Sequence, residues 1–510
     1  MAEYKTKNLL AFDFGAESGR AMLGRFDGDK ISLEEIHRFP NEAVNMIGTL
    51  YWDLPRLFLE LKKGLLVALK MTSSDLDGIG IDTWGVDFGF IDRDGRILGN
   101  PVHYRDKRTK GILQKASEIV PIEEIFYSTG SQTMEINSIY QLLSMVLNKS
   151  DLLKIADKFL MIPDLFNYLL TGGKFGEYTV ASTSQMLNQV ERKWSISMLE
   201  KFGVPAAILP ELIEPANIIG PLSDEVSEEV GAKKISVIAP ACHDTASAVA
   251  AVPAVFEKDS WAFLSSGTWS VMGVEIHEPL VNKLVIDSGF ANEGGIFNTS
   301  RLLKNINALW ILQECRREWE KVDLRSITYD EINRIIEQAE PFSGFIDPDE
   351  PTFIASGRME ERILTYLKDT GQVINPTRGR IARIILESIA MKYRYNFDIL
   401  KHLLERDIKV LHIVGGGAKN RLLCQFTSNV LGIDVYVGPF EATAIGNLTI
   451  QLVALKYINT IQEARQMIAD SFEISRFSPL DVDQWEEQYR RFKKVTGLEL
   501  SDFPKLIITQ

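Results

Sequence analysis

The sequence predicts an α/β protein of two domains, and three observations support this prediction. The chain has 510 residues, which is more than a single hydrophobic core usually holds. Short apolar runs typical of strands alternate with longer segments whose apolar residues recur at helical spacing. A strand–turn–strand pattern at residues 9–24 is echoed, with different spacing, at residues 262–273. We therefore expect two domains, residues 1–244 and 245–510.

The first of these patterns predicts a hairpin with an unusual turn. Residues 9–12 and 21–23 are apolar and predict two antiparallel strands. Between them, Gly15 and Gly19 lack side chains where backbone N–H groups could converge on a phosphate, and Ser18 adds a hydroxyl donor. An ordinary hairpin with a glycine turn is the alternative interpretation.

Asp13 stands at the end of the first predicted strand. A carboxylate there is suited to hold a hydrated Mg²⁺ against a phosphate, because Mg²⁺ keeps several waters and prefers carboxylate oxygen. Asp13 is therefore the candidate metal ligand.

The remaining elements follow an α/β order. Residues 78–91 predict a central strand that breaks at a polar turn and resumes. A triple glycine at residues 415–417 follows an apolar strand and leaves the backbone open to a flat ligand. The other predicted strands are 30–39, 234–239 and 410–414, and the main predicted helical segments are 57–70, 109–170, 420–431, the segment after 441–447, and 481–495.

Composition excludes several classes of protein. The formal charge of −13, without a basic run, argues against nucleic acid or an anionic membrane as partner. No stretch of 18 apolar residues is present. The three cysteines match no zinc or disulfide spacing, and the N-terminus has no room for a signal peptide before Asp13. We expect a cytoplasmic protein.

Motifs of P-loop enzymes, protein kinases, HExxH metalloproteases and G-x-S-x-G hydrolases are all absent.

Three motifs together resemble the FGGY family of sugar kinases. They are Asp13-Phe14-Gly15 with Ser18-Gly19-Arg20, Ser265-Ser266-Gly267-Thr268-Trp269-Ser270, and Val414-Gly415-Gly416-Gly417 with Asn420. The resemblance implies the two-domain actin/Hsp70/hexokinase-like (ribonuclease H-like) fold, with ATP in an interdomain cleft.

Further motifs narrow the resemblance to one branch of this family. They are Ile81 to Phe88, Tyr104-Arg105-Asp106, His243-Asp244-Thr245-Ala246-Ser247-Ala248 and Leu303-Lys304-Asn305-Ile306. This branch phosphorylates L-rhamnulose at O1 in rhamnose catabolism, with ATP and Mg²⁺, giving the 1-phosphate and ADP. The resemblance runs in order from about residue 8 to about residue 480.

The resemblance also implies roles for single residues. Asp244 is implied as the base that takes the proton of the attacking sugar hydroxyl, which agrees with what phosphoryl transfer needs. The alternative is that Asp244 only caps the helix that follows. Implied sugar contacts are Gly85, His243, Thr245 and Asn305. Implied ATP contacts are Ala16, Glu17, Ser18, Gly19, Arg20, Thr268, Gln313 and Gly416.

Some points stay open at this stage. A carboxylate at Glu17 would repel a γ-phosphate, so this side chain either points outward or reaches Mg²⁺ through water. Asp82 and Asp87 are candidates to order sugar hydroxyls or a metal-bound water, and His243 has a structural role as its alternative. The expected partners are a small ketose and ATP, and the chain is a monomer or a homodimer.

Three rival functions remain. One is another sugar kinase of the family, acting on fuculose, xylulose or glycerol. Another is an actin-like nucleotide switch without sugar chemistry, which would not need the sugar-side residues His243, Asp244 and Thr245. The third is an inactive kinase that senses sugar, and the presence of Asp13 and Asp244 argues against it.

Overall fold

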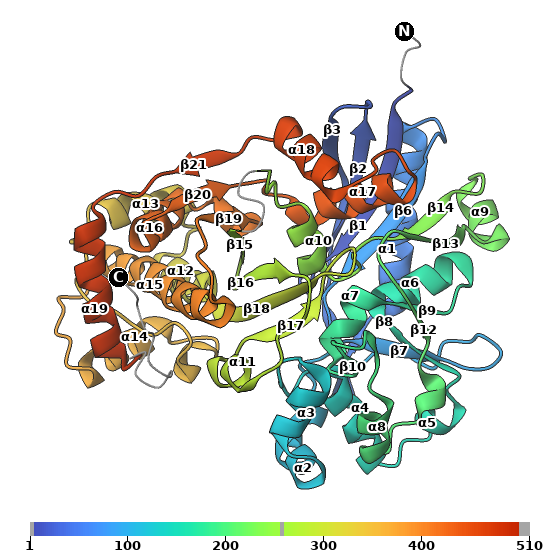
Figure 1. The fold of residues 1–510 in the computed structure, drawn as a ribbon, viewed down its shortest axis with the longest axis horizontal. Helices are drawn as coiled ribbons and strands as arrows, with labels where there is room; N and C mark the ends of the chain where they lie inside the picture. The colour runs from blue at the N-terminus through green and yellow to red at the C-terminus, as the bar shows by residue number, and fades with distance from the viewer. Residues whose placement is uncertain (1–4, 256–259, 499–510) are drawn as a thin grey trace. The chain divides into compact units, whose positions relative to one another are not determined.

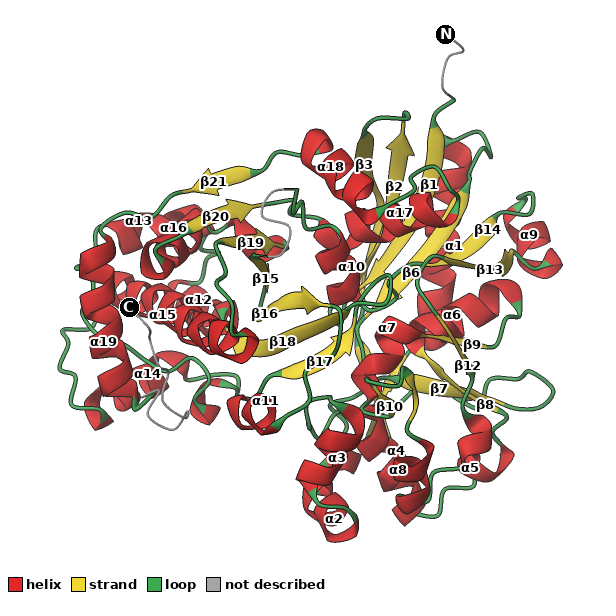
Figure 2. Cartoon of the chain, viewed as in Figure 1, coloured by secondary structure: helices red, strands yellow, loops and turns green. Residues whose placement is uncertain are grey.

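The computed structural model describes residues 5–255 and 260–498, which form two compact units (Figure 1). Within the described residues, the first unit contains residues 5–255, 275–302 and 441–472, and the second contains residues 260–274, 303–440 and 473–498. Both units combine strands and helices (Figure 2), which confirms the predicted α/β class. The division at residues 244 and 245 stays a prediction, and packing places two later segments, 275–302 and 441–472, with the first unit.

A mixed sheet of six strands forms the centre of the first unit. Its order is β13-β14-β6-β1-β2-β3, and β14, β6 and β1 are parallel while the others are antiparallel to their neighbours. The predicted hairpin is thus confirmed as β1 and β2. The strands are β1 (Lys7–Phe14), β2 (Ser18–Phe26), β3 (Ile31–Pro40), β6 (Gly78–Thr83), β13 (Asn217–Pro221) and β14 (Ser236–Ala239).

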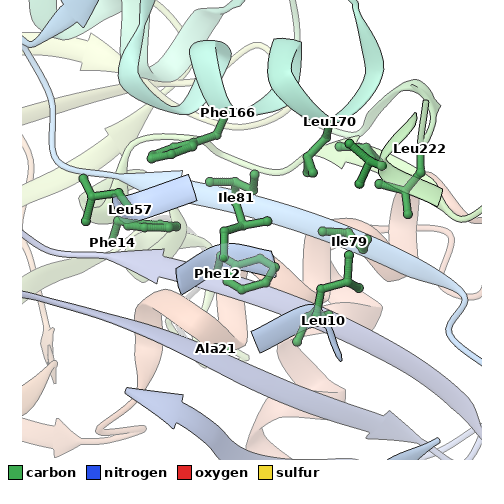
Figure 3. Packing of buried hydrophobic residues seen from close by; sticks show 14 of the residues in the cluster. Leu10, Phe12, Phe14, Ala21, Leu57, Ile79, Ile81, Phe166, Leu170 and Leu222 are labelled. Atoms are coloured by element: carbon green, nitrogen blue, oxygen red, sulfur yellow. The ribbon is translucent and has the colours of Figure 1, made fainter. Parts of the chain in front are cut away.

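The core of this sheet explains why its central strands are apolar. β1 and β6 are buried along most of their length, as strands covered on both faces must be. Figure 3 shows Leu10, Phe12 and Phe14 of β1 beside Ile79 and Ile81 of β6, with helix side chains packed over them. Burying each such side chain contributes about 1.5–3 kcal/mol. The polar residues at the strand ends are therefore held on a rigid base.

Helices and short hairpins complete the first unit. α10 and α17 pack closely, because Gly446 lets the second helix approach the backbone of Ser247. The longer helices are α1 (Leu54–Met71), α2 (Ile112–Ile119), α3 (Ile122–Thr129), α4 (Ser138–Leu147), α6 (Ile162–Thr171), α17 (Ala442–Ala454) and α18 (Ile461–Ser471). The shorter ones are α5 (Leu152–Ile155), α7 (Tyr178–Ala181), α8 (Ile196–Lys201), α9 (Asp224–Val230), α10 (Asp244–Ala250) and α11 (Lys283–Ser288).

The predicted strand at residues 78–91 is only partly continuous with the sheet. Its first half is β6, but its second half, β7 (Phe88–Ile91), leaves the sheet and pairs with β8 (Lys158–Met161). The change of direction occurs at Val86, which has a φ of 66°. Three further pairs are β4 (Ala43–Met46) with β5 (Thr49–Trp52), β9 (Phe175–Glu177) with β12 (Glu211–Ile213), and β10 (Leu187–Asn188) with β11 (Lys193–Trp194).

A second sheet has seven strands in the order β17-β18-β16-β15-β19-β20-β21. β15 and β16 form the second predicted hairpin, and β15 is parallel to β19. The strands are β15 (Trp261–Ser266), β16 (Trp269–Ile276), β17 (Ala291–Gly294), β18 (Ser300–Asn307), β19 (Val410–Val414), β20 (Asp434–Val437) and β21 (Ser475–Phe477). The helices of the second unit are α12 (Leu309–Asp323), α13 (Tyr329–Glu337), α14 (Met359–Asp369), α15 (Arg378–Leu404), α16 (Arg421–Leu431) and α19 (Val482–Thr496).

Within the described ranges, no helix is both long and apolar enough to cross a bilayer.

Candidate active site

The carboxyl ends of three parallel strands bring Asp13, Asp82 and Asp244 of the first unit to one sheet edge. Asp13 on β1 lies opposite Asp82 on the neighbouring strand β6. Thr83, the last residue of β6, bridges to His243, which follows β14. Asp244 is the next residue and begins α10. The structure thus brings the predicted metal ligand and the predicted base to the same edge, with Asp82 between their strands.

Asp13 forms an ion pair with Arg20, which lies opposite it on the neighbouring strand β2. The Arg20 guanidinium forms ion pairs with both Asp13 and Glu441. Asp13 is 6% exposed. Its burial raises the pKa of its carboxyl above the ordinary value, although the charge of Arg20 acts in the opposite direction. The same two carboxylates raise the pKa of Arg20, despite its own burial, so this cation is fixed.

Asp82 is a fully buried carboxyl with one oxygen in use. Its Oδ2 accepts a hydrogen bond from Asn447 Nδ2 at 2.6 Å, and its Oδ1 has no hydrogen-bond partner among the described residues. Burial and the charge of Asp13 raise its pKa well above the ordinary value.

The loop between β1 and β2 is closed differently from the prediction. The Gly15 N–H donates to the Ser18 carbonyl at 2.9 Å, so this amide is used within the turn. Gly19 is a glycine because a Cβ there would collide with the ring of Phe39. The Gly15 N–H is therefore not available to a phosphate in this conformation, and Gly19 has a packing reason to lack a side chain. Whether this loop binds a phosphate stays a prediction.

The other residues of this loop are arranged around its rim. Ala16 and Ser18 are half-buried, whereas Glu17 is exposed. Asn41 donates from Nδ2 to the Gly15 carbonyl at 2.8 Å, and its backbone N–H donates to the Glu17 carbonyl at 3.0 Å. Asn41 thus braces the loop from the end of β3.

Asp244 is placed inside the first turn of α10. His243 is the N-cap residue and Asp244 is the first helical residue, one position past that from which a side chain caps a helix. Its Oδ1 accepts from the backbone N–H of Thr245 and from the Thr245 hydroxyl at 3.0 Å. The Asp244 side chain remains 33% exposed, which leaves it accessible to a ligand.

His243 is enclosed by charged groups. Its Nε2 lies 3.3 Å from Asp244 Oδ1, and its Nδ1 lies 3.3 Å from Glu293 Oε2 and 3.2 Å from Arg301 Nη2. Burial raises the pKa of Glu293, but its interactions with His243 and Arg301 outweigh this and lower it to about 2. The backbone N–H of His243 donates to the Thr179 hydroxyl at 3.2 Å.

Gly85 has a structural reason to lack a side chain. A Cβ there would lie 2.7 Å from Oγ1 of Thr183, and this hydroxyl accepts from the Val86 N–H. The neighbouring Asp87 is completely buried, and its carboxylate accepts from the indoles of Trp52 and Trp84, among other donors. Asp87 therefore holds the turn together from within, and it is not free to order a ligand.

The remaining predicted residues lie in the second unit. The Thr268 hydroxyl donates to Gln313 Oε1 at 3.3 Å, and the backbone N–H of Trp310 donates to the Thr268 carbonyl at 3.0 Å. Gly416 follows β19, and a Cβ there would meet no atom within 4 Å. Asn305 is half-buried on β18. The structure brings Thr268 and Gln313 into contact as one polar pair.

Several residues of the site were missed by sequence reasoning. Glu293, Arg301, Glu441, Asn447 and Asn41 all contact a predicted site residue or Asp82. The adjacent pair Gly294-Gly295 could have drawn attention to Glu293, because paired glycines indicate that the backbone closely approaches another group. Here a Cβ on Gly294 would press on the ring of Tyr178. Among the described residues, no three His, Cys, Asp or Glu side chains are arranged to hold a metal ion by themselves.

Comparison with known families and proteins gives a consistent result. Residues 8–251 match the N-terminal domain of the FGGY family of carbohydrate kinases, and residues 262–455 match its C-terminal domain. A protein of Bacteroides thetaiotaomicron named rhamnulokinase is 40% identical over 96% of this chain and 99% of its own length. Proteins of the same name from Halalkalibacterium halodurans and Bacillus subtilis are 39% and 37% identical, over 92% and 93% of this chain and 99% and 96% of their own lengths.

Solved structures share the fold at low sequence identity. A ligand-bound xylulose kinase from Lactobacillus acidophilus has a TM-score of 0.79 at 16% identity, over 98% of this chain and 99% of its own. A glycerol kinase from Plasmodium falciparum, solved with ADP, has a TM-score of 0.78 at 18% identity, over 97% of this chain and 98% of its own. These likenesses extend to the arrangement of elements along nearly the whole chain.

Proposed function

This chain belongs to the FGGY family of carbohydrate kinases, and on that premise we propose that it phosphorylates L-rhamnulose at O1, producing L-rhamnulose 1-phosphate and ADP from ATP. The observation that carries the proposal is the convergence of Asp13, His243 and Asp244 at one edge of the first sheet. The relatives with the name rhamnulokinase support the choice of sugar, because their similarity covers nearly the full length of both chains.

The proton chemistry is assigned to Asp244. Its partly exposed carboxylate accepts the proton of the sugar O1 hydroxyl as this oxygen bonds to the γ-phosphorus. The bond from that phosphorus to the β–γ bridging oxygen breaks, and ADP leaves with the electron pair. His243 and Thr245, which contact Asp244, are the proposed sugar contacts on either side of it, and Gly85 and Asn305 complete the proposed set.

The residues at the sheet edge fit a bound Mg²⁺. Mg²⁺ is usually held by one or two carboxylates together with substrate phosphates and water, so a site without a cluster of three acids suits it. Asp13 is the proposed ligand, and the unpartnered Oδ1 of Asp82 beside it is placed to hydrogen-bond a coordinated water. When bound, Mg²⁺ would neutralise charge on the phosphate oxygens.

ATP contacts are proposed in both units. In the first unit they are Arg20, already oriented by Asp13 and Glu441, with Ala16, Glu17, Ser18 and Gly19 of the same loop. In the second unit the Thr268–Gln313 pair and the open backbone at Gly416 are the proposed contacts. The arginine is suited to phosphate because its guanidinium is planar and always charged.

A coupled ADP-release assay over L-rhamnulose, L-fuculose, D-xylulose and glycerol tests the substrate. We expect kcat/KM for L-rhamnulose to exceed the others by about 100-fold, roughly 2.7 kcal/mol of transition-state discrimination. A higher value for another sugar would reassign the substrate within the family. ATP turnover that no sugar stimulates would favour the nucleotide-switch alternative.

We also propose that the protein works in the cytoplasm. Cys242, Cys315 and Cys424 are free and buried, which suits a reducing compartment that supplies ATP. Fractionation of the source cells with an antibody against the protein would test this location.

A further inference from the structure

We propose that Glu293 and Arg301 are positioning residues that keep the imidazole proton of His243 on Nε2, where it faces Asp244. This proton then orients the Asp244 carboxylate so that it can accept the proton of the sugar. The proposal rests on the proposed function for the role of Asp244. The assignment of the proton itself rests only on the geometry of the free protein.

We assign the donors from the order of the distances together with the hydrogens that each group carries. Arg301 Nη2 lies 3.0 Å from Glu293 Oε2 and 3.2 Å from His243 Nδ1. The contact between His243 Nδ1 and Glu293 Oε2 is longer, at 3.3 Å. A guanidinium Nη carries two hydrogens and accepts none. One hydrogen therefore goes to the carboxylate and the other to Nδ1.

The position of the imidazole proton follows from this. Because Nδ1 accepts from Arg301, it carries no hydrogen, and the single proton of the neutral ring must be on Nε2. Nε2 lies 3.3 Å from Asp244 Oδ1, so the N–H points at a carboxylate. The opposite tautomer would set two lone pairs against each other across the same distance.

The network is held rigidly around the ring. The Arg301 side chain is 1% exposed, and its Nε donates to the Gly294 carbonyl at 2.8 Å. The backbone of residues 242 and 243 is fixed by Glu177 and Thr179, which accept from the two N–H groups. Glu177 and Glu275 add negative charge near Arg301. Turning the ring away would leave a buried N–H of Arg301 without its acceptor Nδ1, which is costly.

The arrangement also separates the two oxygens of Asp244. The contacts from His243 and from both donors of Thr245 all fall on Oδ1. We assign Oδ2 to the substrate proton. Hydrogen bonds on Oδ1 fix the orientation of the carboxylate and leave Oδ2 available as the base.

Nitrogen NMR of the free protein labelled with ¹⁵N-histidine tests the proton position. The sequence has six histidines, and the spectrum of His243→Gln identifies the signals of His243. We expect a protonated Nε2 and an unprotonated Nδ1 at neutral pH. A proton on Nδ1, with or without one on Nε2, would overturn the proposal. This readout needs neither sugar nor ATP, so it stands even if the substrate proves to be different.

Kinetics of Glu293→Gln test the consequence for catalysis. The substitution keeps the size of the side chain but removes the charge that holds Arg301. We expect kcat to fall about tenfold, roughly 1.4 kcal/mol, while KM for ATP stays within twofold. In a His243→Gln background the same substitution should change kcat by less than twofold, because Glu293 acts through His243. Equal losses in both backgrounds would show a role independent of the histidine.

Glu387→Gln is the matched control. Glu387 is also a buried carboxylate paired with an arginine, Arg383, at 2.7 Å, but it lies on α15 in the second unit. It should lower stability comparably while leaving kcat and the His243 signals unchanged. If Glu293→Gln does no more than this control, the pair is only structural. Arg301→Lys, which keeps a donor to His243 Nδ1, should leave the imidazole proton of His243 on Nε2, whereas Arg301→Met should not.

Discussion

The two sheets share the same hairpin topology, but the residues at their strand ends differ. Those of the first sheet include charged residues, and those of the second are neutral. In the first sheet β1 is antiparallel to β2 and parallel to β6, and in the second β15 is antiparallel to β16 and parallel to β19. The first edge carries Asp13, Asp82 and Asp244. The second edge carries serines, Thr268 and the glycines 415–417. The same strand arrangement therefore carries charged residues at the edge of the first sheet and neutral residues at the edge of the second.

This difference separates two tasks. Charged groups in a partly buried site interact strongly with developing charge, so the first edge is suited to proton transfer and metal binding. Neutral hydroxyls and open backbone make weaker and less specific contacts, which suit the binding of a nucleotide. Substitutions at the first edge should therefore affect turnover, and those at the second should affect ATP affinity.

Asp244→Asn should have the largest effect. Asparagine keeps the size and a hydrogen bond but cannot accept a proton, so we expect kcat to fall by about 10²–10⁴. Calorimetry should show ATP and sugar binding within a few-fold of the wild type. A kcat within about threefold, less than 1 kcal/mol of barrier, would remove Asp244 from the mechanism and break the contrast between the edges.

Asp13→Asn should come next. Loss of the carboxylate removes the proposed metal ligand while Arg20 keeps its ion pair with Glu441. We expect kcat to fall by about 10²-fold or more, and half-maximal activity to need more Mg²⁺. Assays across a Mg²⁺ titration measure both. Near wild-type turnover at the usual Mg²⁺ concentration would contradict the metal role.

Thr268→Val tests the neutral edge and should act on affinity. It removes one neutral hydrogen bond, worth about 0.5–1.5 kcal/mol, so the Kd for ATP should rise about 2–13-fold with kcat within threefold. Thr427→Val is the control, because Thr427 is a buried threonine of α16 whose hydroxyl donates to the Leu423 carbonyl of the same helix. A large loss of kcat at Thr268 would show that the second edge also acts in catalysis.

Alanine substitutions of Gly19 at the first edge and Gly416 at the second should differ in their effect on the free energy of unfolding. Gly19→Ala forces a methyl group against the ring of Phe39, and such overpacking costs about 1–3 kcal/mol. Gly416→Ala meets no neighbouring atom within 4 Å, so its free energy of unfolding should change by less than about 0.5 kcal/mol. Urea unfolding of both variants measures this. Similar losses at the two sites would show that our account of Gly19 is wrong.

Glu17→Ser should have the smallest effect. The Glu17 side chain is exposed in the structure, which agrees with the outward orientation. We expect kcat and both KM values within twofold of the wild type, because serine keeps the backbone through which residue 17 would contact ATP. A loss above about tenfold, roughly 1.4 kcal/mol, would mean that this carboxylate reaches the metal or a substrate and belongs to the charged edge after all.

The sequence was sufficient for the class of the fold and for the residues at the strand ends. Apolar runs followed by Asp13, Asp244 or Gly415 are local patterns, and they located β1, the start of α10 and the end of β19. The carboxyl ends of parallel strands lie at one edge of a sheet. The resemblance implied that Asp13 and Asp244 serve one reaction, and the structure places both at one edge of the first sheet. Their roles remain predictions.

Tertiary structure alone decided what surrounds these residues. Arg20 meets Glu441 across 421 positions of the chain, and Arg301 meets His243 across 58. Such pairs leave no periodicity in the sequence, because each partner looks locally like an ordinary polar residue of a strand or loop. Gly19 and Gly85 are explained by Phe39 and Thr183, which no turn pattern predicts. Residue type and strand order determined where the acids lie, whereas packing between distant segments determined which of them are paired, buried or free to react.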